Sequence, residues 1–200
     1  MVPIALLFWL IVEIATYVNL TRYFFGLSIE AALLPAIGAL LGLRVGIVAI
    51  TLIFGRVFAS PGAPLSTAGH VRIAIGEYLA FIFAFIIVLP FERLWMGADR
   101  LRPGGTPILL VHGYGCSRGV WWFIRRGLEA AGHTVATVSL TPPYTSIGKL
   151  VPQLRERIEA VGQATGSPQV IIVAHSMGGL VARSYLARHG TERVGGLITL

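Results

Sequence analysis

Three long apolar stretches fill most of the first 96 residues and limit what this half of the chain can fold into. They run from about 3 to 20, from about 31 to 58 and from about 71 to 95. A helix that crosses a bilayer needs about 20 apolar residues. The same 96 residues contain only five Arg, four Glu and no Lys. We therefore predict an all-α transmembrane region of about three helices over residues 1–98.

Two of these stretches leave alternatives open. The first is unlike a cleaved signal peptide, because no basic residue precedes it and no small-x-small site stands out before Arg22. The second is long and contains Pro35 and Arg44, so it fits a tilted helix, a broken helix or a re-entrant pair. A turn-rich segment over residues 60–66 separates the second stretch from the third.

Charged residues within the apolar stretches are costly in hydrocarbon and are functional candidates for that reason. They are Glu13, Arg44 and Glu77. One Arg and two Glu do not make a convincing transport path, so we expect these groups to pair with each other or to lie near the headgroups.

The second half has the composition of a soluble domain, with a net charge of +6 over residues 97–200 out of +7 for the whole chain. Its arginines are scattered within helical patterns beside glutamates, without a basic stripe interleaved with aromatics, so no nucleic-acid partner is predicted. The single cysteine, Cys116, excludes an intrachain disulfide and a CxxC metal site. We expect no metal and no cofactor.

Short apolar runs alternate with helical patterns through residues 99–200. The runs cover residues 108–111, 134–140, 169–174 and 194–200, and the helical patterns cover about 119–131, 146–164 and 178–188. Pro152 lies inside the second helical pattern, so the regular helix is allowed to start there. This order is typical of a parallel sheet with helices on both faces, whose ligands bind at the carboxyl ends of the strands.

A lone serine follows the third apolar run and immediately precedes a helical pattern. In the sequence Ala174-His175-Ser176-Met177-Gly178-Gly179, small residues stand two positions before and after Ser176. A nucleophilic serine on a sharp strand-to-helix turn needs this clearance, because the turn is strained and crowded. The backbone N–H of Met177 is then placed to stabilise an oxyanion.

A second loop follows the first apolar run, in the sequence Val111-His112-Gly113-Tyr114-Gly115. The glycines on both sides of Tyr114 allow its backbone to turn toward a substrate. We predict that the N–H of Tyr114 is the second oxyanion donor. His112 is expected to hold this loop rather than to transfer protons.

Together the two segments resemble the α/β-hydrolase superfamily, particularly its lipases and esterases, and the A-H-S-M-G-G form is similar to bacterial lipases. The resemblance covers residues 106–200. It implies roughly the third to sixth strands of an eight-stranded sheet, with Ser176 as the nucleophile and Tyr114 and Met177 as amide donors. The acid and base of the family follow the strand at 194–200, so we expect a C-terminally incomplete sequence that is inactive alone.

The other candidate side chains have simpler interpretations. His175 is adjacent to Ser176 but points elsewhere, and His189 lies at the far end of the helix that Ser176 precedes. Asp99 falls in the segment before the first strand. Trp121 and Trp122 either line an acyl pocket or dock their helix.

The expected function is that of a membrane-anchored serine hydrolase, which cleaves carboxylic, and specifically lipid, esters through an acyl-serine intermediate. The alternatives are an acyltransferase on the same fold and a non-catalytic binding module anchored to the membrane. The expected partners are the bilayer and an ester or lipid substrate. The expected location is a bacterial inner membrane, as a multi-pass protein, and four arginines against two beside the spans favour a cytoplasmic soluble domain. A second stretch that crosses twice reverses this orientation.

Overall fold

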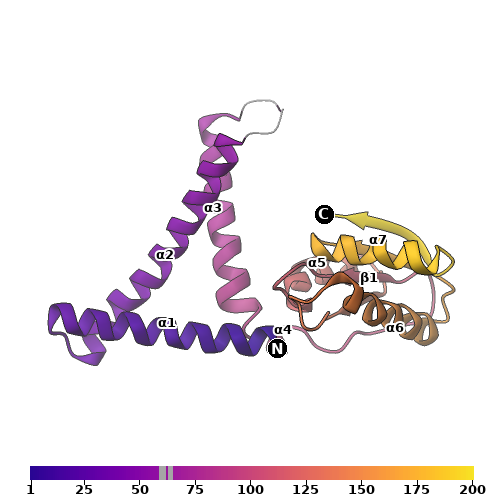
Figure 1. Ribbon diagram of the computed structural model, residues 1–200, viewed down its shortest axis with the longest axis horizontal. Helices are drawn as coiled ribbons and strands as arrows, with labels where there is room; N and C mark the ends of the chain where they lie inside the picture. Colours follow the sequence, from indigo (N-terminus) through magenta and orange to yellow (C-terminus); the bar gives the residue numbers. More distant parts are fainter. Residues whose placement is uncertain (59–61, 63–64) are drawn as a thin grey trace. The chain divides into compact units, whose positions relative to one another are not determined.

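The computed structural model describes residues 1–58, 62 and 65–200 and divides them into two compact units (Figure 1). One unit comprises Ala5–Pro90, and the other comprises Phe91–Leu200 together with Met1–Ile4. The turn-rich segment expected at 60–66 lies mostly outside the described residues. The predicted change from membrane to soluble character at residue 98 lies eight positions beyond the division at Pro90.

The first unit is built from long apolar helices, as predicted. They are α1 (Val2–Phe25), α2 (Ile29–Val57) and α3 (Thr67–Ile82), and α3 continues into a π-helical segment, η1 (Phe83–Val88). Three helices in the described part of the chain are long and apolar enough to cross a membrane. The second stretch is one continuous helix rather than a broken or re-entrant pair. Its 29 residues extend about 43 Å, more than the roughly 30 Å hydrocarbon thickness of a bilayer.

Local signals explain where these helices begin and end. The hydroxyls of Ser28 and Ser66 cap α2 and α3, accepting hydrogen bonds from the N–H groups of Ala31 and Gly69. The third helical stretch ends at Val88 instead of the expected 95. Pro90 has no N–H, so it is unable to donate the next hydrogen bond of the helix. A separate short helix, α4 (Glu92–Trp95), follows.

Two of the three charged residues in the apolar stretches pair with each other. The guanidinium of Arg44 makes two hydrogen bonds with the carboxylate of Glu13, and the hydroxyl of Tyr17 donates to the same carboxylate at 3.0 Å. Arg44 also donates to the carbonyl of Leu40 at 3.1 Å. The expectation of mutual pairing is therefore confirmed for Glu13 and Arg44, while Glu77 is exposed.

The second unit contains a four-stranded parallel sheet. The strands are β1 (Ile108–Val111), β2 (Val135–Val138), β3 (Val170–Ala174) and β4 (Val194–Thr199), in the order β2-β1-β3-β4. In the register of the two central strands, Val111 pairs with Ala174. The carboxyl ends of β1 and β3 therefore lie side by side, which brings together the two loops that the sequence singled out.

Helices cover both faces of this sheet (Figure 1). They are a 3₁₀ turn, η2 (Arg118–Trp121), followed by α5 (Trp122–Ala130), then α6 (Ile147–Thr165) and α7 (Met177–His189). Because side chains alternate along a strand, Leu109 and Val111 join the core beneath α6 and α7, whereas Ile108 and Leu110 pack with Trp121 on the other face. Trp121 is 3% exposed and docks its helix.

The helix α6 begins earlier than the proline suggested. Ser146 is the N-cap and Pro152 lies inside the helix. A proline removes one N–H from the helical ladder. Buried Leu150, Leu154 and Ile158 hold α6 against the sheet, and this packing outweighs the loss.

Candidate active site

Ser176 occupies the sharp turn between β3 and α7. Its φ is 50° and its ψ is −121°, and it is the only non-glycine residue with positive φ in the described ranges 1–58, 62 and 65–200. This backbone conformation is unfavourable for an L-residue and persists only where surrounding structure enforces it. Here the N–H of Ser176 donates to the carbonyl of Leu200 at 3.0 Å, and the N–H of Gly179 donates to the carbonyl of Ser176 at 2.9 Å.

Gly178 is required for close approach of backbone to backbone. A Cβ at this position lies 2.6 Å from the carbonyl oxygen of Val111 and 2.7 Å from that of His112. Its neighbour Gly179 is less crowded, with Thr199 Cγ2 at 3.1 Å. The first turn of α7 therefore rests directly on the end of β1.

The loop after β1 lies against Ser176 itself. A Cβ on Gly113 lies 3.2 Å from the Cβ of Ser176 and 2.9 Å from Nδ1 of His175. Gly115 serves a different purpose, because its φ of 65° is a conformation that glycine adopts without strain. The N–H of Gly115 faces the carbonyl of Pro143 at 3.4 Å, which ties this loop to the turn after β2.

Two backbone amides at this point are left without partners. The N–H groups of Tyr114 and Met177 have no hydrogen-bond acceptor among the residues that the structure describes. Met177 is the first residue of α7, and the N–H groups of a first helical turn have no partner within the helix. The sequence predicts these same two amides as the oxyanion donors. Their lack of acceptors is compatible with that role, which remains a prediction.

His112 holds the loop in place from beneath. Its side chain is fully buried, Nε2 accepts a hydrogen bond from the N–H of Leu140 at 2.9 Å, and Nδ1 lies 2.9 Å from the carbonyl of Gly113. Because a backbone N–H only donates, Nδ1 must carry the proton and donate to Gly113. Burial lowers the pKa of His112, which favours this neutral form.

The remaining histidines do not complete a catalytic arrangement with Ser176. No hydrogen bond joins the Ser176 hydroxyl to a histidine in the described part of the chain, and the ring of His175 lies over Gly113. His189 is the last residue of α7, and the centre of its ring lies 5.1 Å from the centre of the Tyr185 ring. Within the described residues there is no group of three or more His, Cys, Asp or Glu that is arranged to hold a metal ion.

Two acidic residues have structural importance that the sequence did not reveal. The carboxylate of Glu92 accepts hydrogen bonds from the Ser117 hydroxyl and, at 3.2 Å, from the N–H of Gly119, so it anchors the chain that leaves the Tyr114 loop. Asp99 bonds to β2 and to three arginines. Neither residue belongs to a motif, and their partners lie 19 or more positions away.

Comparison with known proteins identifies the fold of this unit. Residues 106–200 match the family model described as alpha/beta hydrolase fold. This part of the chain is therefore similar to proteins of the α/β-hydrolase fold, and the predicted fold class is confirmed: a partial parallel sheet with flanking helices, accompanied by three long apolar helices.

Individual relatives share this unit at low identity. A protein of Oryza sativa subsp. indica, named probable esterase PIR7A, is 28% identical over 86 residues, which are 40% of this chain and 33% of the relative. The chain thus spans about a third of this curated relative. Bacillus licheniformis lipase BlEst2 has a TM-score of 0.44 at 25% identity, covering 52% of this chain and 42% of its own. Epoxide hydrolase A from Mycobacterium thermoresistibile has a TM-score of 0.41 at 18% identity, covering 52% and 33%.

Proposed function

We propose that this protein is a serine hydrolase that cleaves carboxylic esters through an acyl-serine intermediate on Ser176. One observation carries the proposal: a positive-φ serine between β3 and α7 lies against the Gly113 loop, beside the free amides of Tyr114 and Met177. The relatives named esterase and lipase support the same reaction class.

In this reaction the Ser176 oxygen bonds to the carbonyl carbon of the ester, and the carbonyl electron pair moves onto oxygen. The N–H groups of Tyr114 and Met177 stabilise this oxyanion, a contribution worth about a hundred- to a thousandfold in rate for each donor. Collapse of the oxyanion then breaks the bond to the leaving alcohol, and water later releases the acid. A general base must accept the proton of Ser176, and the described residues place no hydrogen-bonded base at that hydroxyl.

We further propose that the ester is a lipid and that the protein resides in a bacterial inner membrane with residues 99–200 in the cytoplasm. The support is the three helices of membrane-spanning length and the excess of arginines beside the first loop and after the third helix. A fluorescent protein fused after Leu200 should fluoresce, because it matures in the cytoplasm. A fusion that does not fluoresce contradicts the proposed orientation, but it does not bear on the reaction proposed for Ser176.

A fluorophosphonate probe tests the nucleophile on the full-length gene product. We expect covalent labelling of Ser176 that is abolished by Ser176→Ala. The matched control is Ser146→Ala, which removes an exposed hydroxyl that makes no capping hydrogen bond. Failure to label Ser176 in the folded protein contradicts the enzyme proposal and favours a binding module. Product analysis with added alcohol then separates hydrolysis from acyl transfer.

A further inference from the structure

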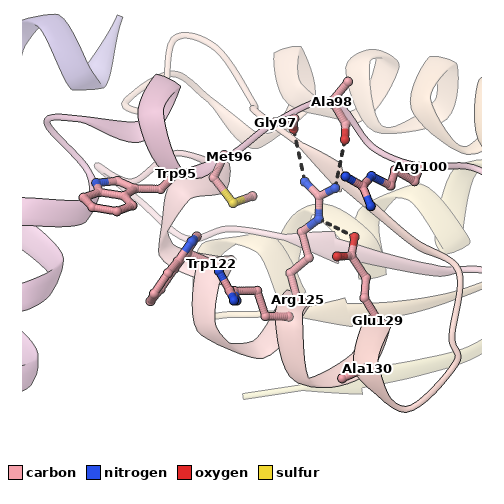
Figure 2. Close-up of a pocket in the computed structure, with 10 residues that line it drawn as sticks. Trp95, Met96, Gly97, Ala98, Arg100, Trp122, Arg125, Glu129 and Ala130 are labelled. Carbon is pink, nitrogen blue, oxygen red and sulfur yellow. Dashed lines mark hydrogen bonds and ion pairs between the residues drawn. The ribbon is translucent and has the colours of Figure 1, made fainter.

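The second unit contains a pocket on the side of α5, built entirely from residues of that unit. Its volume is about 670 Å³, and Figure 2 shows the side chains that line it. The segment 95–100 forms one wall, and α5 forms the other with Trp122, Arg125, Arg126 and Glu129. None of these residues has a part in the chemistry proposed for Ser176.

Three arginines line this pocket, and only two of them lack a carboxylate partner among the described residues. Arg125 is neutralised, because it bonds to Glu129 at 2.7 Å and Asp99 at 3.0 Å and donates to the carbonyls of Gly97 and Ala98. Figure 2 shows the guanidinium of Arg125 bonded to Glu129, Gly97 and Ala98, with Arg100 beside it. Arg100 and Arg126 are exposed, and neither has a carboxylate partner among the described residues. The pocket therefore presents two uncompensated guanidinium groups.

Aromatic rings adjoin these charges. The rings of Trp95 and Trp122 meet edge to face at 5.9 Å, and the guanidinium of Arg126 lies 5.2 Å from the centre of the Trp122 ring. Around them Leu94 and Phe123 are each 76% exposed. Tryptophan and arginine next to exposed apolar side chains are typical of surfaces at the headgroup level of a bilayer.

The position in the chain fits such a surface. Trp95 follows Val88, the last residue of the third apolar helix, by seven positions in the sequence. A tether of this length keeps the segment 95–100 near the bilayer in which that helix is expected to lie. Two arginines in such a place attract anionic headgroups more strongly than zwitterionic ones.

We propose that this pocket binds the phosphate headgroup of an anionic phospholipid. Arg100 and Arg126 bind the phosphate oxygens, and Trp95 and Trp122 contact the glycerol and the first methylenes of the acyl chains. Arginine suits this role because its planar donor groups match phosphate geometry and also stack on aromatic rings. The bound lipid is a recognition partner, distinct from the ester that reacts at Ser176.

Calorimetric titration of the full-length protein in a neutral detergent tests the proposal. The ligands are dihexanoyl phosphatidylglycerol, dihexanoyl phosphatidylcholine and inorganic phosphate. We expect the phosphatidylglycerol to bind in preference to both others, and its affinity to fall as salt is raised. Each arginine is worth about fivefold in affinity, so R126Q should weaken binding about fivefold and R100Q/R126Q about 25-fold.

The matched control is R183Q/R188Q, which removes the same charge from two exposed arginines of α7. It should change the affinity less than twofold. An equal loss in both double variants shows a nonspecific charge effect and overturns the proposal. Equal binding of phosphatidylcholine, or binding of inorganic phosphate as tight as that of the lipid, also overturns it. The readout is binding rather than turnover, so it is independent of the proposal for Ser176.

Discussion

The carboxylate of Asp99 accepts a hydrogen bond from the backbone N–H of Thr137 at 2.7 Å, on the outer edge of the edge strand β2. It also bonds to the Thr137 hydroxyl at 2.9 Å and to Arg157 at 2.5 Å, and its side chain is 4% exposed. An unpaired strand edge invites association with other chains. The segment before β1 therefore protects this edge through Asp99.

Replacing Asp99 should destabilise the second unit strongly. Asp99→Asn removes a buried carboxylate that pairs with three arginines and leaves buried Arg125 with Glu129 alone, so we expect a loss of about 3 kcal/mol, the lower end of the cost of breaking a buried pair. Equilibrium unfolding of the full chain in detergent measures the loss. The control is Glu159→Gln, which breaks the exposed pair with Arg155 and should leave stability nearly unchanged. Similar stability of the two variants contradicts the role given to Asp99.

An added methyl at Gly178 should disrupt the turn that presents Ser176. The atoms that Gly178→Ala meets are carbonyl oxygens of β1 and the loop after it, which are unable to move aside as a flexible side chain does. We expect a loss of about 1–3 kcal/mol in unfolding free energy and loss of fluorophosphonate labelling.

The matched control is Gly127→Ala in α5, where nothing lies within 4 Å of the added methyl. Alanine is the better helix former by about 1 kcal/mol, so this variant should be slightly more stable than the parent. If Gly178→Ala keeps both the stability and the fluorophosphonate labelling of the parent, the turn is not as crowded as the structure indicates and the prediction is wrong.

The buried imidazole of His112 predicts a dependence of stability on pH. Burial lowers its pKa in the folded state below the ordinary value of 6.5, so the unfolded state binds more protons as the pH falls. The stability that His112 contributes is therefore complete above pH 6.5 and is lost progressively below it, until the folded pKa is reached. Thermal unfolding between pH 8 and pH 5 should show this loss, on a scale set by about 1.4 kcal/mol per unit of pH.

His112→Gln keeps an acceptor for the N–H of Leu140 but does not titrate. Its stability should be lower at pH 8 and less dependent on pH than that of the parent. If the stability of His112→Gln falls as steeply as that of the parent between pH 6.5 and pH 5, the dependence on pH comes from other groups.

The Glu13–Arg44 pair should behave as a unit in the apolar helices. Glu13→Leu leaves Arg44 without its carboxylate, at a cost of about 3 kcal/mol in a bilayer environment. The double variant with Arg44→Leu removes both charges and should recover most of that loss. Unfolding in mixed micelles, analysed as a double-mutant cycle, measures the coupling. If the losses from the two single changes add up in the double variant, the coupling energy between Glu13 and Arg44 is zero and the prediction is wrong.

The sequence by itself determined the elements of this protein and the outline of its candidate site. Apolar length predicted three membrane-spanning helices, and alternation of apolar runs with helical patterns predicted the parallel sheet. The small residues around Ser176 and the glycines around Tyr114 marked two loops, because the demand for space at a tight turn is local. These signals reside within a few consecutive positions, where periodicity and residue size suffice.

Only the tertiary structure decided the partners that hold these elements. Asp99 and Arg157 are 58 positions apart, and His112 and Leu140 are 28 apart. The pocket on α5 likewise joins residues 95–100 to residues 122–130. A charge pair or hydrogen bond depends on geometry within about 3 Å, and that geometry arises only when packing of the core brings distant segments together.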